Sequence, residues 1–80
     1  MKIFKDLEFN TDTSELPTAN IKFENGYGAT IIDTKEQIEG YGPYELMVVS
    51  DDGWLERVNS PLKFLTKRDV TELLIKIQQL

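Results

Sequence analysis

The fold of this chain is decided by residues 20–33, which read NIKFENGYGATIID. Two short runs rich in β-forming residues, Ile21–Phe23 and Ala29–Ile32, flank Asn25-Gly26, a dipeptide typical of tight hairpin turns. We therefore expect an antiparallel β-hairpin here, and its register determines which side chains share the buried face.

Side-chain parity decides between two registers of this hairpin. A two-residue Asn-Gly loop would pair Phe23 with Gly28 and mix apolar and polar side chains on each face. A three-residue loop, Glu24–Gly26 with Gly26 in the left-handed conformation, pairs Phe23 with Tyr27 instead. Because one face of a small sheet must be buried, we favour the three-residue loop. It gathers the apolar side chains on one face: Ile21, Phe23, Tyr27, Ala29 and Ile31.

Further strands are expected on both sides of the hairpin. Weak alternation predicts a first strand over Ile3–Phe9, and Asn10–Asn20 has the composition of a loop. After the polar loop Thr34–Pro43, the residues Tyr44–Ser50 predict a strand with Leu46 and Val48 pointing inward. A turn at Asp51-Asp52-Gly53 then leads into a return strand over Trp54–Val58.

The C-terminal residues predict an amphipathic helix. Thr66 is a good N-cap with Asp69 three residues later, and Leu65 and Val70 fit a hydrophobic staple. The apolar stripe of this helix is Val70, Leu73, Leu74, Ile77 and Leu80. We therefore expect a single domain over residues 1–80 with an α+β fold, a four-stranded, mainly antiparallel sheet with the C-terminal helix packed on one face.

Composition excludes several classes of chemistry. The 80 residues are 40% hydrophobic and 29% charged, and they include no cysteine and no histidine. Disulfides, zinc sites built from Cys and His, thiol nucleophiles and histidine acid–base catalysis are therefore excluded. The longest apolar run, Leu46–Val49, is too short for a membrane span or a signal peptide. We expect a soluble, non-secreted protein that does not bind membranes.

The charge is concentrated in the middle of the chain. The net charge is -5, but residues 6–56 carry twelve acids and two lysines, a net charge of -10. This field disfavours nucleic acid and anionic membranes as direct ligands, because their phosphates attract clustered Lys and Arg. It favours a basic protein surface, such as the nucleic-acid-binding groove of a partner. A simpler interpretation, that the acids only maintain solubility, stays open.

No motif predicts catalysis, a cofactor or a metal site. Asp51 and Asp52 are adjacent, but a small sheet with one helix has little volume for a cleft that separates their pKa values. Asp51-Asp52-Gly53 also lacks the later ligands of a calcium loop. The run Gly40-Tyr41-Gly42-Pro43 opens no helix and has no phosphate-binding lysine.

Aromatic residues lie among these acids and suggest a contact surface. Tyr41, Tyr44 and Trp54 are either strand residues that pack or anchors of a protein interface, and both interpretations stay open. For a partner-binding surface we predict acids for attraction and two aromatic anchors. These residues are Glu36, Glu39, Tyr41, Asp51, Asp52, Trp54 and Glu56.

Three stretches together resemble a known group of proteins. They are Phe23-Glu24-Asn25-Gly26-Tyr27-Gly28, Tyr44-Glu45-Leu46, and Phe64-Leu65-Thr66 with the helix stripe that follows. The chain resembles a family of small acidic proteins of unknown function encoded by phages of Gram-positive bacteria. The resemblance covers most of residues 19–80 and leaves out residues 1–18. It implies a phage gene product that works by binding in the host cytoplasm, and it carries over no catalytic residue.

These observations predict a non-enzymatic binding protein. In a phage setting, it would inhibit or modulate a host or defence protein, such as a CRISPR or restriction nuclease, through its acidic surface. The alternative is a minor structural or assembly protein of the phage particle. The expected partner is a protein with a basic surface, and the sequence is compatible with a monomer or a homodimer.

Overall fold

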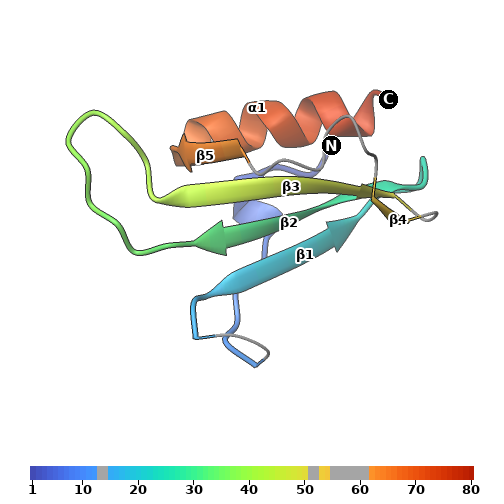
Figure 1. The fold of residues 1–80 in the computed structure, drawn as a ribbon. Helices are drawn as coiled ribbons and strands as arrows, with labels where there is room; N and C mark the ends of the chain where they lie inside the picture. The colour runs from blue at the N-terminus through green and yellow to red at the C-terminus, as the bar shows by residue number, and fades with distance from the viewer. Residues whose placement is uncertain (13–14, 51–52, 55–61) are drawn as a thin grey trace.

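A computed structural model describes residues 1–12, 15–50, 53–54 and 62–80 of the chain. The elements, in chain order, are a 3-10 helix η1 (Phe4–Asp6), strands β1 (Thr18–Lys22), β2 (Tyr27–Asp33), β3 (Tyr44–Ser50), β4 (Gly53–Trp54) and β5 (Leu62–Leu65), and helix α1 (Lys67–Gln78). Strands β1 to β4 follow one another in an antiparallel sheet, and α1 packs across one face of it (Figure 1). This is the α+β fold that the sequence predicts.

The hairpin of β1 and β2 has the predicted three-residue loop. Ile21 pairs with Ala29, and the backbone N–H of Phe23 donates to the carbonyl of Tyr27 at 2.8 Å. Gly26 adopts the left-handed conformation with a φ of 87°. The register predicted from side-chain parity is therefore confirmed.

The core lies between this hairpin, β3 and α1. As predicted, Leu46 and Val48 point into it. The buried side chains of the core come from both layers: Ala29, Ile31, Tyr44, Leu46, Val48, Val70, Leu74 and Ile77. Leu73 is only partly buried, and the prediction for Leu80 is wrong, since it lies beyond the end of α1 and is 65% exposed.

The start of α1 carries the predicted capping box. The backbone N–H of Asp69 donates to the Thr66 hydroxyl at 3.1 Å, and the Asp69 carboxylate accepts from the Thr66 N–H at 2.9 Å. The hydrogen bonds with the Thr66 N–H and hydroxyl hold the pKa of Asp69 below its usual value. The helix therefore begins where the local sequence sets it.

Strand β5 was not predicted. Residues 27–33 of β2 pair with β3 along its full length. Because β2 occupies one edge of β3, strands β4 and β5 both pair with the opposite edge. Strand β4 pairs at the Val49 end, and β5 pairs at the Tyr44 end. Strand β5 thereby carries the chain from the sheet edge to the beginning of α1 (Figure 1). Residues 55–58 of the predicted return strand lie outside the described residues.

The predicted strand over Ile3–Phe9 is wrong. The Asp6 carboxylate accepts from the Ile3 N–H at 2.8 Å, and the Asp6 N–H donates to the Ile3 carbonyl at 2.9 Å, which closes a 3-10 turn. Such local side-chain bonds compete with strand pairing. The predicted loop over Asn10–Asn20 is also too long, because β1 begins at Thr18 and a single bridge joins Thr18 to Asn10.

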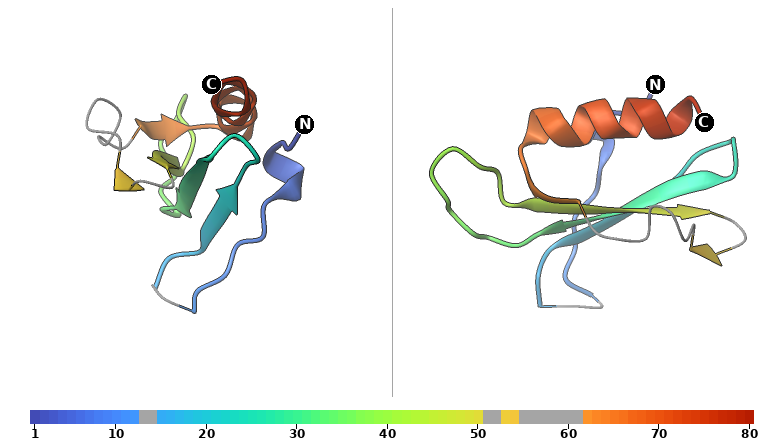
Figure 2. Two further views of the ribbon diagram at one scale, coloured as in Figure 1. Left: turned by 90° about the vertical axis from the view of Figure 1, so that its right-hand side faces the viewer. Right: turned by 45° about the horizontal axis from the view of Figure 1, so that its top comes forward.

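The N-terminal segment runs beside the edge strand β1 and reaches the side of α1 (Figure 2). The Phe4 N–H donates to the Thr71 hydroxyl at 3.1 Å, and the Phe4 ring lies 5.1 Å from the Tyr44 ring. The Lys67 ammonium lies 5.6 Å from the centre of the Phe4 ring. Ring contacts and a hydrogen bond to α1, rather than a continuous strand pairing, therefore attach residues 4–9 to the core.

Asn25 connects the hairpin loop to the far end of α1. Its amide nitrogen donates to the carbonyl of Ile77 at 2.9 Å and approaches that of Leu80 at 3.4 Å. Its amide oxygen accepts from the Tyr27 N–H at 3.1 Å. The hairpin turn thus adds a side-chain donor to the Ile77 carbonyl, which also accepts from the Leu80 N–H at 3.2 Å, and ties the loop to the helix end.

Asn25→Asp should destabilise the domain by about 1–3 kcal/mol. The carboxylate can still accept from the Tyr27 N–H, but it cannot donate to the Ile77 carbonyl and adds negative charge at the negative end of the helix dipole. Urea unfolding followed by circular dichroism measures the loss. The charge-matched control is Asn20→Asp, because Asn20 only needs to accept from the Thr30 hydroxyl. Equal losses in the two variants would contradict the role of Asn25.

Candidate protein-interaction surface

The loop between β2 and β3, residues 34–43, is closed at its base. The Thr34 N–H and hydroxyl both donate to the Pro43 carbonyl, at 2.9 and 2.7 Å. The Asp33 carboxylate accepts from the Lys35 N–H at 3.0 Å. These bonds hold the loop beside β5, at the end of β3 where α1 begins (Figure 1).

A tight turn within this loop brings Ile38 and Tyr41 together. The Tyr41 N–H donates to the Ile38 carbonyl at 3.0 Å, and Gly40 has a φ of 84°. A positive φ at the third residue is typical of a type II turn, which suits glycine there. Because the first and fourth residues of such a turn lie close together, Ile38 and Tyr41 become neighbours.

Gly42 docks the loop directly onto β5. Its N–H donates to the Phe64 carbonyl at 3.2 Å. A Cβ atom on Gly42 would collide with the backbone of Leu65 and Thr66. Only glycine allows so close an approach between the loop and the chain that enters α1.

A bulge in β5 turns Phe64 toward the loop. Tyr44 pairs with Leu65 and Leu46 pairs with Leu62, so the β5 strand has one more residue than β3 in this interval. Phe64 has a φ of 61°, in the left-handed region that costs a non-glycine residue about 1–2 kcal/mol. Its ring lies 5.9 Å from the Tyr41 ring. The backbone therefore carries local strain where it presents this aromatic side chain.

Ile38, Tyr41 and Phe64 form an apolar surface that we call the loop–β5 patch. They line an open hollow of about 310 Å³. Ile38 is 42% exposed, Tyr41 63% and Phe64 48%. Single exposed apolar residues are ordinary, but a cluster drawn from two segments is typical of a contact surface.

Two carboxylates in the same loop have no ion-pair partner among the described residues. Glu36 and Glu39 are both exposed. Lys35, in the same loop, and Lys63, next to Phe64 in the chain, pair with other acids: the Lys35 ammonium lies 3.5 Å from the Asp33 carboxylate, and the Lys63 ammonium lies 3.9 Å from the Glu45 carboxylate. The loop that supplies Ile38 and Tyr41 therefore carries uncompensated negative charge.

The structure divides the predicted partner-binding residues. Glu36, Glu39 and Tyr41 share the 34–43 loop, whereas the backbone of Trp54 pairs with Val49 at the other end of β3. Asp51, Asp52 and Glu56 lie outside the described residues. The predicted anchors Tyr41 and Trp54 therefore belong to opposite ends of the sheet.

Tyr44, the third aromatic residue of the acidic region, is a core residue. It is buried and packs against the rings of Phe4 and Phe9, at 5.1 and 6.0 Å. Burial, and then the charge of Asp33, raise the pKa of its hydroxyl above the usual value. Packing is thus the role of Tyr44.

Sequence reasoning missed Ile38 and Phe64. Ile38 lies in a polar loop, but the Gly40 that follows it could have indicated the turn that exposes it. Phe64 belongs to Leu62–Leu65, a short β-prone run between Pro61 and the helix cap, which could have indicated β5. The bulge that turns Phe64 outward has no counterpart in the sequence pattern.

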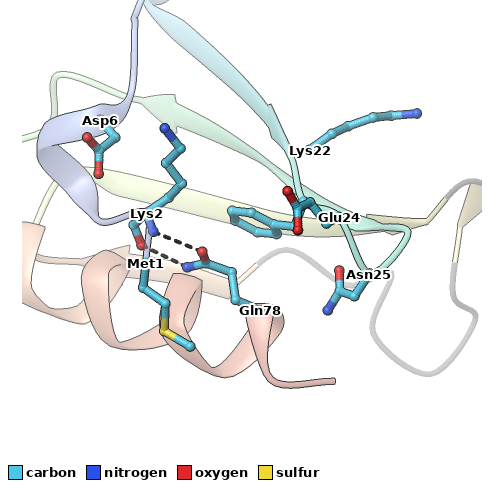
Figure 3. A pocket seen from close by; sticks show the side chains of 8 residues that line it. Met1, Lys2, Asp6, Lys22, Glu24, Asn25 and Gln78 are labelled. Atoms are coloured by element: carbon cyan, nitrogen blue, oxygen red, sulfur yellow. Dashed lines mark hydrogen bonds between the residues drawn. The ribbon is translucent and has the colours of Figure 1, made fainter.

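A second concave surface lies between the chain start, the hairpin loop and the end of α1 (Figure 3). The Lys2 N–H donates to the Gln78 side-chain oxygen at 2.9 Å, and the Gln78 amide nitrogen donates to the Lys2 carbonyl at 2.8 Å. The open space measures about 770 Å³ and is lined by Met1, Lys2, Asp6, Lys22, Phe23, Glu24, Asn25 and Gln78. Because its charges are of both signs, electrostatics select no class of ligand there.

Two further findings concern the described ranges alone. They contain no group of three or more Asp and Glu residues close enough to hold a metal ion. No helix within them is long and apolar enough to cross a lipid bilayer.

Comparisons with protein families, curated proteins and solved structures find no match for this chain. The resemblance to small phage proteins stays a prediction from the sequence.

Gly42→Ala should destabilise the domain by about 1–3 kcal/mol or more, because the added methyl group meets backbone rather than a flexible side chain. Amide chemical shifts should move over residues 62–69, in β5 and the helix cap. Gly40→Ala is the matched control, since nothing lies within 4 Å of its Cβ position and only the positive φ is penalised. Its shift changes should stay within residues 38–41. Changes confined to the loop in both variants would contradict the docking of Gly42.

Proposed function

We propose that this chain is a non-enzymatic binding protein of the small phage type, which inhibits or modulates a protein of its bacterial host. The class of target favoured by its acidity is a defence nuclease, of a CRISPR or restriction system, with a basic nucleic-acid-binding groove. Binding takes place in the host cytoplasm. The loop–β5 patch and the adjacent carboxylates make the contact.

The observation that carries this proposal is the exposed apolar cluster. A small protein gains stability by covering large apolar side chains, and yet Ile38, Tyr41 and Phe64 are all exposed. Phe64 also holds a left-handed backbone conformation that favours glycine. Strain at an exposed aromatic residue supports a role in recognition, because local strain in proteins clusters at functional positions.

The negative charge supports a basic target. Glu36 and Glu39 lie in the same loop as two of the three apolar residues, and neither is neutralised within the described part of the chain. Charges beside an apolar anchor steer association and select partners of opposite sign. A basic groove offers such a partner, and occupying it would block its nucleic acid.

The test uses the double variant Tyr41→Ala/Phe64→Gly. Tagged wild-type protein and the variant are exposed to lysate of phage-infected host cells, and the retained proteins are quantified by mass spectrometry. Wild type should retain a basic protein at least about tenfold more than the variant, since aromatic anchors dominate interface energies. Leu80→Ala is the control, because Leu80 is an apolar residue at least as exposed as Tyr41 and Phe64 but lies beyond the far end of α1.

Two results would contradict the proposal. One is a target retained equally by wild type and the double variant, and the other is no protein retained above an empty support. Recovery of virion proteins instead would favour the alternative role in particle assembly. The free energy of unfolding of the single variant Phe64→Gly should lie within about 1 kcal/mol of the wild-type value. Relief of the left-handed backbone strain offsets the lost contact between the two rings.

A further inference from the structure

We propose that the loop–β5 patch binds a short basic segment of a protein partner, with one large apolar side chain in the hollow and Lys or Arg beside it. The apolar side chain would contact Ile38, Tyr41 and Phe64, and the cations would pair with Glu36 and Glu39. This inference rests on the proposed function and specifies the chemistry of the partner.

The size of the hollow points to one inserted side chain. At about 310 Å³ it lies at the low end of ligand sites, which span roughly 300–1,000 Å³. Its lining consists of three apolar side chains from the loop and from β5. An open hollow of this kind suits an aliphatic or aromatic side chain and offers no pattern of polar groups to orient a small metabolite.

Charge selects the kind of chain that supplies this side chain. A second copy of this protein would bring another Glu36 and Glu39 to the same interface, and like charges would oppose the contact. A nucleic acid would meet the same repulsion from its phosphates. A basic protein segment pairs with both carboxylates, so it is the occupant that the charge favours.

The Tyr41 ring adds a second attraction for cations. It is 63% exposed, and its neighbour Phe64 meets it with the ring planes inclined at 60°. Lys or Arg placed over an exposed tyrosine face is attracted by the ring quadrupole. Arg contributes more often than Lys to such contacts, so arginine beside the apolar side chain fits both Tyr41 and the carboxylates.

The patch is held in shape before any partner arrives. The Ile38–Tyr41 turn, the Gly42–Phe64 hydrogen bond and the closure at Thr34 fix the loop on β5. Ordering a loop during association lowers affinity, and a loop already fixed avoids that cost. A short segment can therefore bind here without the rest of its protein, which makes a peptide test informative.

The test uses capped five-residue peptides of the form Arg-Arg-Xaa-Arg-Arg, with Xaa as Phe, Leu or Ala, and a Glu-Glu-Phe-Glu-Glu control. Binding is followed by backbone amide shifts of the full-length protein. The Phe and Leu peptides should shift residues 36–42 and 62–65. They should bind about tenfold more tightly than the Ala peptide, and the acidic peptide should not bind.

Two double variants separate local from overall charge. The double variant Glu36→Gln/Glu39→Gln should bind the Phe peptide about fivefold or more weakly than wild type. The double variant Glu15→Gln/Glu24→Gln should bind it with unchanged affinity. Both pairs are exposed, and both variants change the net charge from -5 to -3. Equal weakening in the two variants would show that attraction depends on overall charge, and it would overturn the inference.

Further results would overturn the inference that the patch binds a basic segment. Equal binding of the Phe and Ala peptides, or no shifts at millimolar peptide, would overturn the inference. So would Phe64-dependent dimers in sedimentation experiments, because a second copy would then occupy the patch. If a captured host protein depends on Phe64 but the Phe peptide does not compete with it, this inference fails and the proposed function stands. If the peptides bind as expected but lysate yields no partner, the proposed function fails alone.

Discussion

Leu74 and Val70 of α1 are fully buried against Ile31 and Leu46 of the two central strands. A chain of 80 residues has room for one small core, so this contact fixes where every other segment can lie. The helix must cross the face of β2 and β3, and its capped N-terminus must lie where the chain leaves the sheet. Strand β5 supplies that exit along the edge of β3.

The candidate surface is a consequence of this exit. Because β5 ends beside the start of β3, the loop that precedes β3 is brought against it and Gly42 contacts its backbone. The bulge that lets Leu65 and Leu62 both pair with β3 leaves Phe64 turned outward in a strained conformation. An aromatic residue from one segment thereby joins Ile38 and Tyr41 of another.

This arrangement is the basis of the proposed binding role. The surface has apolar side chains, two exposed carboxylates and a loop backbone that is hydrogen-bonded to β5, and the chain contains no histidine or cysteine. The second concave surface, near the chain termini, combines lysines and acids without a dominant sign. Of the two, the loop–β5 patch combines apolar side chains with two exposed carboxylates that have no ion-pair partner among the described residues, and the proposed partner is chosen to match that combination.

Elements that depend on residues close together in the chain could be predicted from the sequence. The Thr66–Asp69 cap, the helix stripe through Leu74 and the register around Gly26 depend on residues a few positions apart, and each was predicted from spacing and parity. The alternation over Ile3–Phe9 predicted a strand that does not form. A hydrogen bond from the Ile3 N–H to the Asp6 carboxylate stabilises a turn there instead. Charge and composition also identified Glu36, Glu39 and Tyr41 as surface candidates.

Which of these surface residues contact one another depends on the tertiary structure. Tyr41 and Trp54 are close to the same acidic region in sequence, but β3 separates them because they belong to its two ends. Ile38 and Phe64 lie far apart in sequence, and only the pairing of β5 with β3 and the fit of Gly42 bring them together. Contacts of this kind depend on backbone approach across the whole sheet, and no local pattern of residues encodes them.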